Sequence, residues 1–225
     1  MFDTNLHFPS PEDKLRDTIA QAHFPCVGAK SAMARGALKV LSCWSLTSGW
    51  DDVRIHRALL DWSHSYRASP GGLRSLVIAF DQPQQLSEAE FETAMWARIQ
   101  SLADKDHWLG QPYDQRVSAA TDDPHFSLSF GGEAFFVVGL HPNASRPARR
   151  MPFPTLVFNL HDQFERLRAE GVYDRMRERI LDRDKALAGN INPMLAQHGE
   201  ISEARQYSGR AVGADWQCPF RDPRE

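Results

Sequence analysis

The sequence predicts a single α+β domain in which a small, mostly antiparallel sheet packs against several helices. Two short apolar runs, 76–80 and 155–158, are typical of buried strands. Residues 126–140 place two strand-forming runs around Gly131 and Gly132, which indicates a hairpin. Helix-forming segments precede, separate and follow these strands, and this order favours an antiparallel sheet.

The length and the charge limit the class of protein. With 225 residues, and roughly 150 residues per domain, the chain has room for one large domain or two small ones. No linker divides it, so we expect an N-terminal arm and first helix at 1–23 and one main domain at 24–225. The net charge of −3 and the pI of about 6.3 argue against a nucleic-acid-binding protein, which usually carries a concentrated positive surface.

Signals for helix starts mark the N-terminal part of the chain. Ser10, followed by Pro11, predicts a helix that runs to about His23. The segment 27–43 is rich in Ala, Leu and Lys and predicts a second helix, although Gly36 weakens it.

Similar signals recur further along. The acidic pair at 51–52 opens a helix whose apolar residues share one face. Ser87, with a glutamate three residues later, forms a capping-box pattern. Residues 104–125 are polar and predict an extended loop. Helices are then expected from 162 to about 189, followed by a short one near 193–205.

The cysteines and the apolar runs suggest a compartment. The chain has three cysteines, an odd and sparse set that does not form a disulfide framework. The most apolar run, 134–140, is far shorter than the ~20 residues of a membrane-spanning helix. No secretory signal is evident at the N-terminus. We therefore expect a cytoplasmic protein with no membrane partner.

Two histidines lie where predicted strands end. His141 and His161 each follow an apolar strand, and loops that begin at such rigid points often carry function. A neutral imidazole is a good iron ligand. The alternative is a half-exposed, hydrogen-bonded histidine with no ligand.

Cationic and sulfur-bearing side chains are further candidates. Arg146, Arg149 and Arg150 form a cluster that suits a carboxylate or phosphate, or else a solvated surface. Cys26 and Cys218 each adjoin a proline, and a thiolate can also hold iron, although a buried cysteine is more often a small apolar residue.

Two segments differ in the information that they carry. Residues 162–185 hold seven acidic and seven basic side chains, which predicts a solvated helical face laced by ion pairs four residues apart. Residues 202–220 instead crowd large polar and aromatic side chains with little apolar periodicity, which is unusual for a loop without function.

Four motifs together resemble the YqcI/YcgG family. They are FPCVGAKSA at 24–32, HPNASRPARR at 141–150, PTLVFNLHDQFERLR at 154–168, and NPMLAQHGEISEARQYSGR with WQCPF at 192–220. The resemblance covers about 24–220, and its C-terminal half is the more specific part.

The resemblance implies an activity. Several members of this family are haem-dependent enzymes that N-hydroxylate an amino-acid nitrogen, notably the guanidino group of arginine. This implies haem b as cofactor, O2 and an external electron donor as partners, and a small amine or amino acid as substrate. Two alternatives are a non-catalytic haem sensor or carrier, which the Cys218–Pro219 pair fits, and a haem-free protein that binds a small molecule or partner. The exposed hairpin edge makes a homodimer plausible.

If that activity carries over, residue chemistry suggests a role for each candidate. Four side chains are candidates for the axial iron ligand: His141 first, His161 second, and Cys26 or Cys218 behind them. Two arginines are candidates for holding the haem propionates: Arg146 and Arg150. Three side chains near the C-terminus are candidates for holding or contacting the substrate: Glu203, Arg205 and Tyr207.

Overall fold

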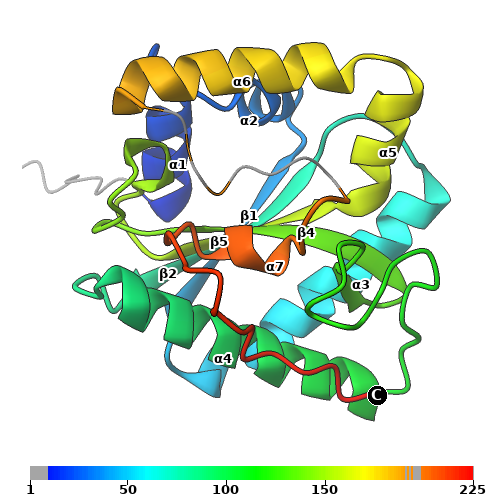
Figure 1. The fold of residues 1–225 in the computed structure, drawn as a ribbon. Coiled ribbons are helices and arrows are strands. Elements are labelled where there is room, and N and C mark those ends of the chain that lie inside the picture. Colours follow the sequence, from blue (N-terminus) through cyan, green and yellow to red (C-terminus); the bar gives the residue numbers. More distant parts are fainter. Residues whose placement is uncertain (1–9, 191, 193, 195–198, 225) are drawn as a thin grey trace, which may run out of the picture.

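A five-stranded sheet runs through the middle of the protein, with helices on both faces (Figure 1). The computed structural model describes residues 10–190, 192, 194 and 199–224. The strands lie in the order β1-β2-β5-β4-β3. Their bounds are Leu38–Ser45 for β1, Ser75–Gln82 for β2, Leu128–Phe130 for β3, Glu133–Leu140 for β4 and Thr155–Leu160 for β5. Only the pair β1–β2 is parallel among these strands, which confirms the predicted α+β class and the mostly antiparallel sheet.

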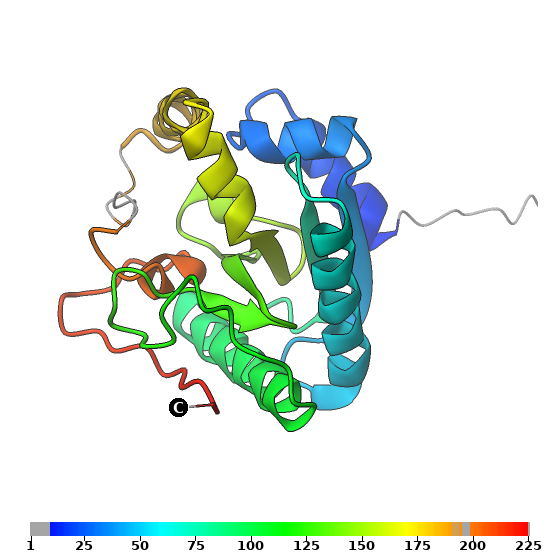
Figure 2. The ribbon, with the colours of Figure 1, turned by 90° about the vertical axis from the view of Figure 1, so that its right-hand side faces the viewer.

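The two faces of the sheet carry different helices (Figures 1 and 2). One face is covered by the helices α1 (Pro11–Ala20), α2 (Val27–Ala34), α5 (His161–Ala169) and α6 (Tyr173–Ala188). The other face is covered by α3 (Asp52–Ala68) and α4 (Glu88–Trp108). We call these the α1/α6 face and the α3/α4 face.

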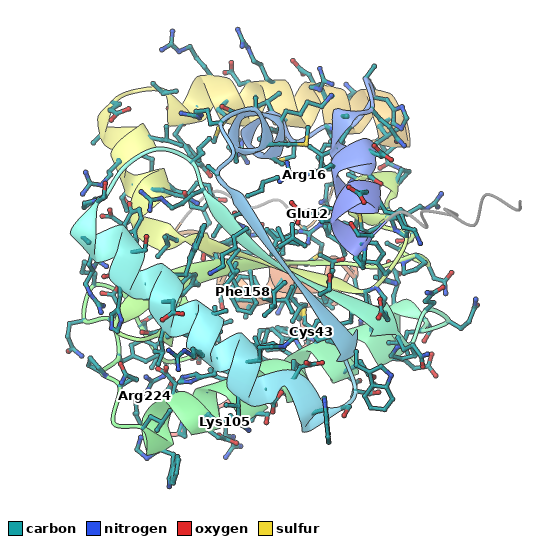
Figure 3. The ribbon with its side chains drawn as sticks, turned by 180° about the vertical axis from the view of Figure 1, so that it is seen from behind. Glu12, Arg16, Cys43, Lys105, Phe158 and Arg224 are labelled. Carbon is teal, nitrogen blue, oxygen red and sulfur yellow. The ribbon has the colours of Figure 1, made fainter. Side chains whose placement is uncertain are left out.

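Alternation along the buried strands sends side chains to two separate cores. In β2, Leu76, Ile78 and Phe80 belong to the core on the α3/α4 face, while Val77 and Ala79 belong to the core on the α1/α6 face. Figure 3 shows Cys43 and Phe158, two further members of the α3/α4 core, beside those helices. Helix α1 packs into the α1/α6 core. The boundary expected at residue 24 stays a prediction.

The capping signals are confirmed. The Ser10 hydroxyl accepts a hydrogen bond from the Asp13 backbone N–H at 3.1 Å, and Ser87 accepts one from Glu90 at 3.3 Å. In both cases the acidic side chain accepts a hydrogen bond from the capping residue's N–H, which completes a capping box.

The single helix predicted over 27–43 is wrong after residue 34. Gly36 has a φ of +66°, a left-handed conformation that ends α2, and the chain then enters β1. Pairing of β1 with the buried strand β2 overrides the helix propensity of the Ala, Leu and Lys residues there.

The loop predicted over 104–125 is also wrong at its start, because α4 continues to Trp108. The polar residues in the last turns of α4 include Asp106, which is fully buried. One oxygen of Asp106 lies 2.7 Å from His56 Nε2 on α3, and the carboxylate accepts the Gly131 N–H at 3.2 Å. Arg224 donates to it at 3.1 Å, which fixes the C-terminal segment beside α4 (Figure 3).

The hairpin, the break near Gly171 and the strand at 155–158 are confirmed. The helix expected near 193–205 is wrong for residues 199–203, which are not helical, and the short α7 (Ala204–Tyr207) overlaps its end; residues 191, 193 and 195–198 lie outside the described residues. Two short 3-10 turns complete the elements, η1 (Gly49–Asp51) and η2 (Pro147–Arg149). In the described part of the chain, no helix combines the length and the apolar character needed to cross a bilayer.

Strand β3 pairs with only the first three residues of β4, and α7 packs near the rest of β4. Helix α7 comes very close at Gly139. A methyl group placed there would lie 2.8 Å from a ring carbon of Phe91 and 3.0 Å from the carbonyl oxygen of Tyr207.

We expect Gly139→Ala to lower the free energy of unfolding by about 1–3 kcal/mol, because the added methyl overfills a packed interface. Urea denaturation measures the loss. Gly28→Ala is the matched control, since its nearest side-chain atom lies 3.7 Å away, and it should change stability by less than about 1 kcal/mol. Equal stability of the two variants would contradict the tight packing of α7 on β4.

Candidate functional site

An apolar cavity of about 270 Å³, which we call the inner cavity, lies on the α1/α6 face of the sheet. Side chains from β1, β2, β4 and β5 form its floor, and α1, α2, α5 and α6 contribute its walls. Its polar lining residues are few: Cys26, Ser75, Arg146, Arg149, Asn159, Gln163, Asp184 and Asn192. A cavity with apolar walls and a few polar groups is the usual form of a small-molecule site.

An open cleft of about 600 Å³, which we call the outer cleft, lies between α2, the 71–73 turn and the helices α5 and α6. The inner cavity and the outer cleft share four lining residues: Gly28, Leu73, Gln163 and Met176. The two spaces therefore adjoin.

Cys26 lines the inner cavity at the start of α2. It is the N-cap residue of that helix, and its Sγ accepts a hydrogen bond from the Ala29 N–H at 3.4 Å. Burial raises the pKa of the Cys26 thiol, while the N–H groups of α2 and the nearby cation of Arg149 oppose this rise. Donors at a helix N-terminus and a neighbouring cation stabilise a thiolate, which is the form of cysteine that binds metals.

Arg149 lines the same cavity from η2. Its guanidinium donates hydrogen bonds to three carbonyl oxygens, those of Gly139 at 3.1 Å, Gln206 at 3.0 Å and Tyr207 at 3.3 Å. Loss of hydration lowers the pKa of Arg149 to about 10, so the side chain is still a cation at neutral pH. It thus joins the uncovered part of β4 to α7 and places a positive charge near Cys26.

The two arginines predicted to hold propionates both make contacts within the protein. Arg146 lines the inner cavity, but its guanidinium is paired with Asp184 of α6 through Nε at 2.9 Å and through Nη2. Arg150 donates to the carbonyl oxygens of Ala144 and Ser145 in its own loop. The propionate role of these two residues stays a prediction.

His141, the first candidate for the iron ligand, does not line the inner cavity. Its ring stacks on Phe91 of α4 with centroids 4.3 Å apart, which puts it on the α3/α4 face. It is 1% exposed, and its Nδ1 has no hydrogen-bond partner among the described residues. Burial lowers its pKa, which favours the neutral imidazole.

His161 and Glu203, separated by 42 positions, come together at the end of β5. His161 Nε2 lies 4.0 Å from Glu203 Oε1, and its Nδ1 lies 3.9 Å from Glu165 Oε1. His161 also lines a polar pocket of about 320 Å³ with Asp114, Arg116, Val117, His125, Asp162 and Glu165. This pocket does not share a lining residue with the inner cavity.

The other C-terminal candidates pack within the protein. Tyr207 is fully buried, its hydroxyl donates to the Phe135 carbonyl at 3.3 Å, and its ring contacts Phe136 on the cavity wall. Arg205 lies over the Trp216 ring and donates to the Trp216 carbonyl at 3.2 Å. Cys218 packs against the α3/α4 core, and burial raises its pKa to about 12.

The outer cleft contains residues that we did not predict from the sequence: Arg35, Arg166, Arg175 and Arg179. A signal for two of them was present, because Arg175, Arg179 and Arg183 recur every four residues and therefore share one face of α6. Counting the charges of the segment conceals this stripe. The described residues contain no group of three or more His, Cys, Asp or Glu side chains placed to hold a metal ion.

Fold and site together define an α+β protein with an apolar cavity that adjoins a cationic cleft. The chain belongs to the YqcI/YcgG family, whose sequence profile matches residues 15–221, and the resemblance found in the motifs is confirmed. Neither the curated proteins nor the solved structures contain a match to the chain.

We expect Arg149→Met to lower the free energy of unfolding by about 2 kcal/mol, because three carbonyl oxygens lose a charged donor in a partly buried site. Arg150→Met is the matched control from the same loop and should cost less than about 1 kcal/mol, since its carbonyl partners lie in its own loop and its side chain is exposed. Chemical denaturation of both variants measures the difference. A loss no greater than that of the control would show that α7 and β4 do not depend on Arg149.

Proposed function

We propose that the protein is a cytoplasmic haem-dependent oxygenase that N-hydroxylates an amine or guanidino nitrogen of an amino-acid-type substrate. The observation that carries the proposal is the inner cavity, whose apolar walls include a thiol at a helix N-terminus. Membership of the YqcI/YcgG family supports it, because several members have this activity.

The size of the site is compatible with haem only if both spaces are used. The inner cavity of about 270 Å³ is slightly below the range of about 300–1,000 Å³ that is common for ligand pockets. The adjoining outer cleft adds about 600 Å³ and brings the total into that range. The apolar floor suits a macrocycle, and the open end suits its charged groups.

The iron ligand that this geometry favours is Cys26. Among the described residues that line the two spaces, the one thiol is that of Cys26, the other sulfur atoms are the thioethers of Met151 and Met176, and no histidine is present. Cys26 stood behind the two histidines among our candidates. Its thiolate is supported by the Ala29 N–H and by the charge of Arg149, in the way that neighbouring donors tune metal ligands elsewhere.

Haem, when bound, would supply the oxygen-activating chemistry. Overall, one atom of O2 forms the new N–O bond, and the other leaves as water with two protons and two electrons from the external donor. The protein holds the cofactor through Cys26 and keeps water from the reacting nitrogen with side chains such as Phe136, Val138 and Val157. The substrate roles of Glu203, Arg205 and Tyr207 remain predictions, since these residues do not line the inner cavity.

We expect protein from haem-supplied cells to show a Soret band with a ferrous-CO maximum typical of thiolate ligation. Cys26→Ser should remove that maximum or move it to a shorter wavelength, because the serine hydroxyl is a poor iron ligand. Absorption spectra with and without dithionite and CO measure this.

Two matched variants make the spectra decisive. Met176→Leu removes the thioether sulfur that lines both spaces and should leave the band unchanged, as should His141→Phe on the opposite face. A band lost in His141→Phe and kept in Cys26→Ser would return the ligand role to His141. Colourless protein from haem-supplied cells would contradict the proposal and favour a haem-free binding protein.

A further inference from the structure

The outer cleft carries a strong excess of positive charge. Four arginines line it, and Glu170 is the one carboxylate among its described lining residues. Three of these arginines belong to the segment 162–185, which as a whole is balanced, since seven acidic residues match seven basic ones. Although α5 and α6 together have no net charge, folding therefore places mainly their positive side chains at the cleft.

Three of these arginines have no carboxylate partner in the described part of the chain. Arg35 bonds only within its own helix end, to the Ser31 hydroxyl at 2.6 Å and the Ser31 carbonyl at 3.3 Å. Among the residues that the structure describes, no side-chain ion pair or hydrogen bond is observed for Arg175 or Arg179, whereas Arg166 is paired with Asp162 at 2.7 Å. Three guanidinium groups thus keep donors that can meet an anion.

These arginines come from two sides of the cleft. Arg35 follows the last turn of α2, and Arg175 and Arg179 lie one turn apart on α6, which packs against α2 (Figure 2). Like charges brought together repel one another, so the arrangement is stabilised when an anion lies between them. The planar donor pairs of arginine suit the oxygens of phosphate and carboxylate.

We propose that the outer cleft is a binding site for a dianionic group, either a phosphoryl group or a pair of carboxylates, held by Arg35, Arg175 and Arg179. The site does not depend on the proposed oxygenase activity, because the three side chains line the cleft whether or not haem is bound in the inner cavity. Two sources have this chemistry: the propionates of a haem seated in the inner cavity, or a separate ligand that enters the cleft.

The test is titration calorimetry of the full chain, prepared without haem, with inorganic pyrophosphate and with succinate at low ionic strength. We expect one or both probes to bind. Arg175→Gln and Arg179→Gln should each weaken binding by roughly three- to ten-fold, and the double variant should weaken it further, because each removes a charged donor from a partly solvated site. The tighter probe identifies the chemistry.

Two further variants separate a built site from general attraction to a basic helix. Glu170→Gln removes the opposing charge of the cleft and should strengthen binding. Arg177→Gln removes one positive charge from the same helix at a residue that does not line the cleft, so it should leave affinity unchanged. Melting temperatures of all variants check that they are folded.

The proposal is overturned if neither probe binds, or if Arg177→Gln weakens binding as much as Arg175→Gln. The same titration on haem-loaded protein then distinguishes the sources. Loss of probe binding identifies the cofactor's own carboxylates as the occupant, and retained binding identifies a separate ligand, and both results support the site.

Discussion

The guanidinium of Arg149 closes the gap that the short strand β3 leaves along β4. Beyond the first three residues of β4, no further strand of the described residues lies on this side to accept its hydrogen bonds, and an uncovered sheet edge exposes unpaired backbone groups. Arg149 donates hydrogen bonds both to the Gly139 carbonyl and to the carbonyls of the last two residues of α7. A cation without its water is costly, and three acceptors offset that cost. The position of α7, the wall of the inner cavity and the charge beside Cys26 all depend on this contact.

The inner cavity exists because the two faces of the sheet are packed with side chains of different size. On the α3/α4 face, the rings of Phe130, Phe135 and Phe158 pack against one another and fill the core. On the α1/α6 face, the buried strand residues are smaller, such as Val77 and Ala79, and the helices above them are held partly by polar contacts. Arg183 of α6, for instance, donates to the Phe24 carbonyl at 3.1 Å. Small floor residues, under helices that polar contacts hold in place, leave space for a ligand.

Signals that act within a few residues predicted much of the fold. Structure that depends on contacts between distant residues could not be predicted from the sequence. Ser10 and Ser87 announce their helices because a cap acts within one turn. Strand β1 was missed because only its pairing with β2, more than 30 residues later, makes a segment with helical composition extended. For the same reason the sequence cannot show which of Cys26, His141 and His161 faces the cavity. That choice depends on the face of the sheet each side chain meets, and the motifs that contain them look equally informative.

Charge illustrates how folding creates a site from a sequence that hides it. Segment totals describe α5 and α6 as neutral, yet Asp184 and Asp162 are used to hold Arg146 and Arg166. Once these acids are committed to structural pairs, the stripe formed by Arg175 and Arg179 has no neutralising partner in the described chain and meets Arg35 across the cleft. A similar double use occurs at Cys26. The first turn of α2 has N–H groups without partners in the helix, and one of them donates a hydrogen bond to the sulfur. In both places, the structural needs of a helix decide which groups are left to bind a ligand, and the two sets of groups line adjoining spaces.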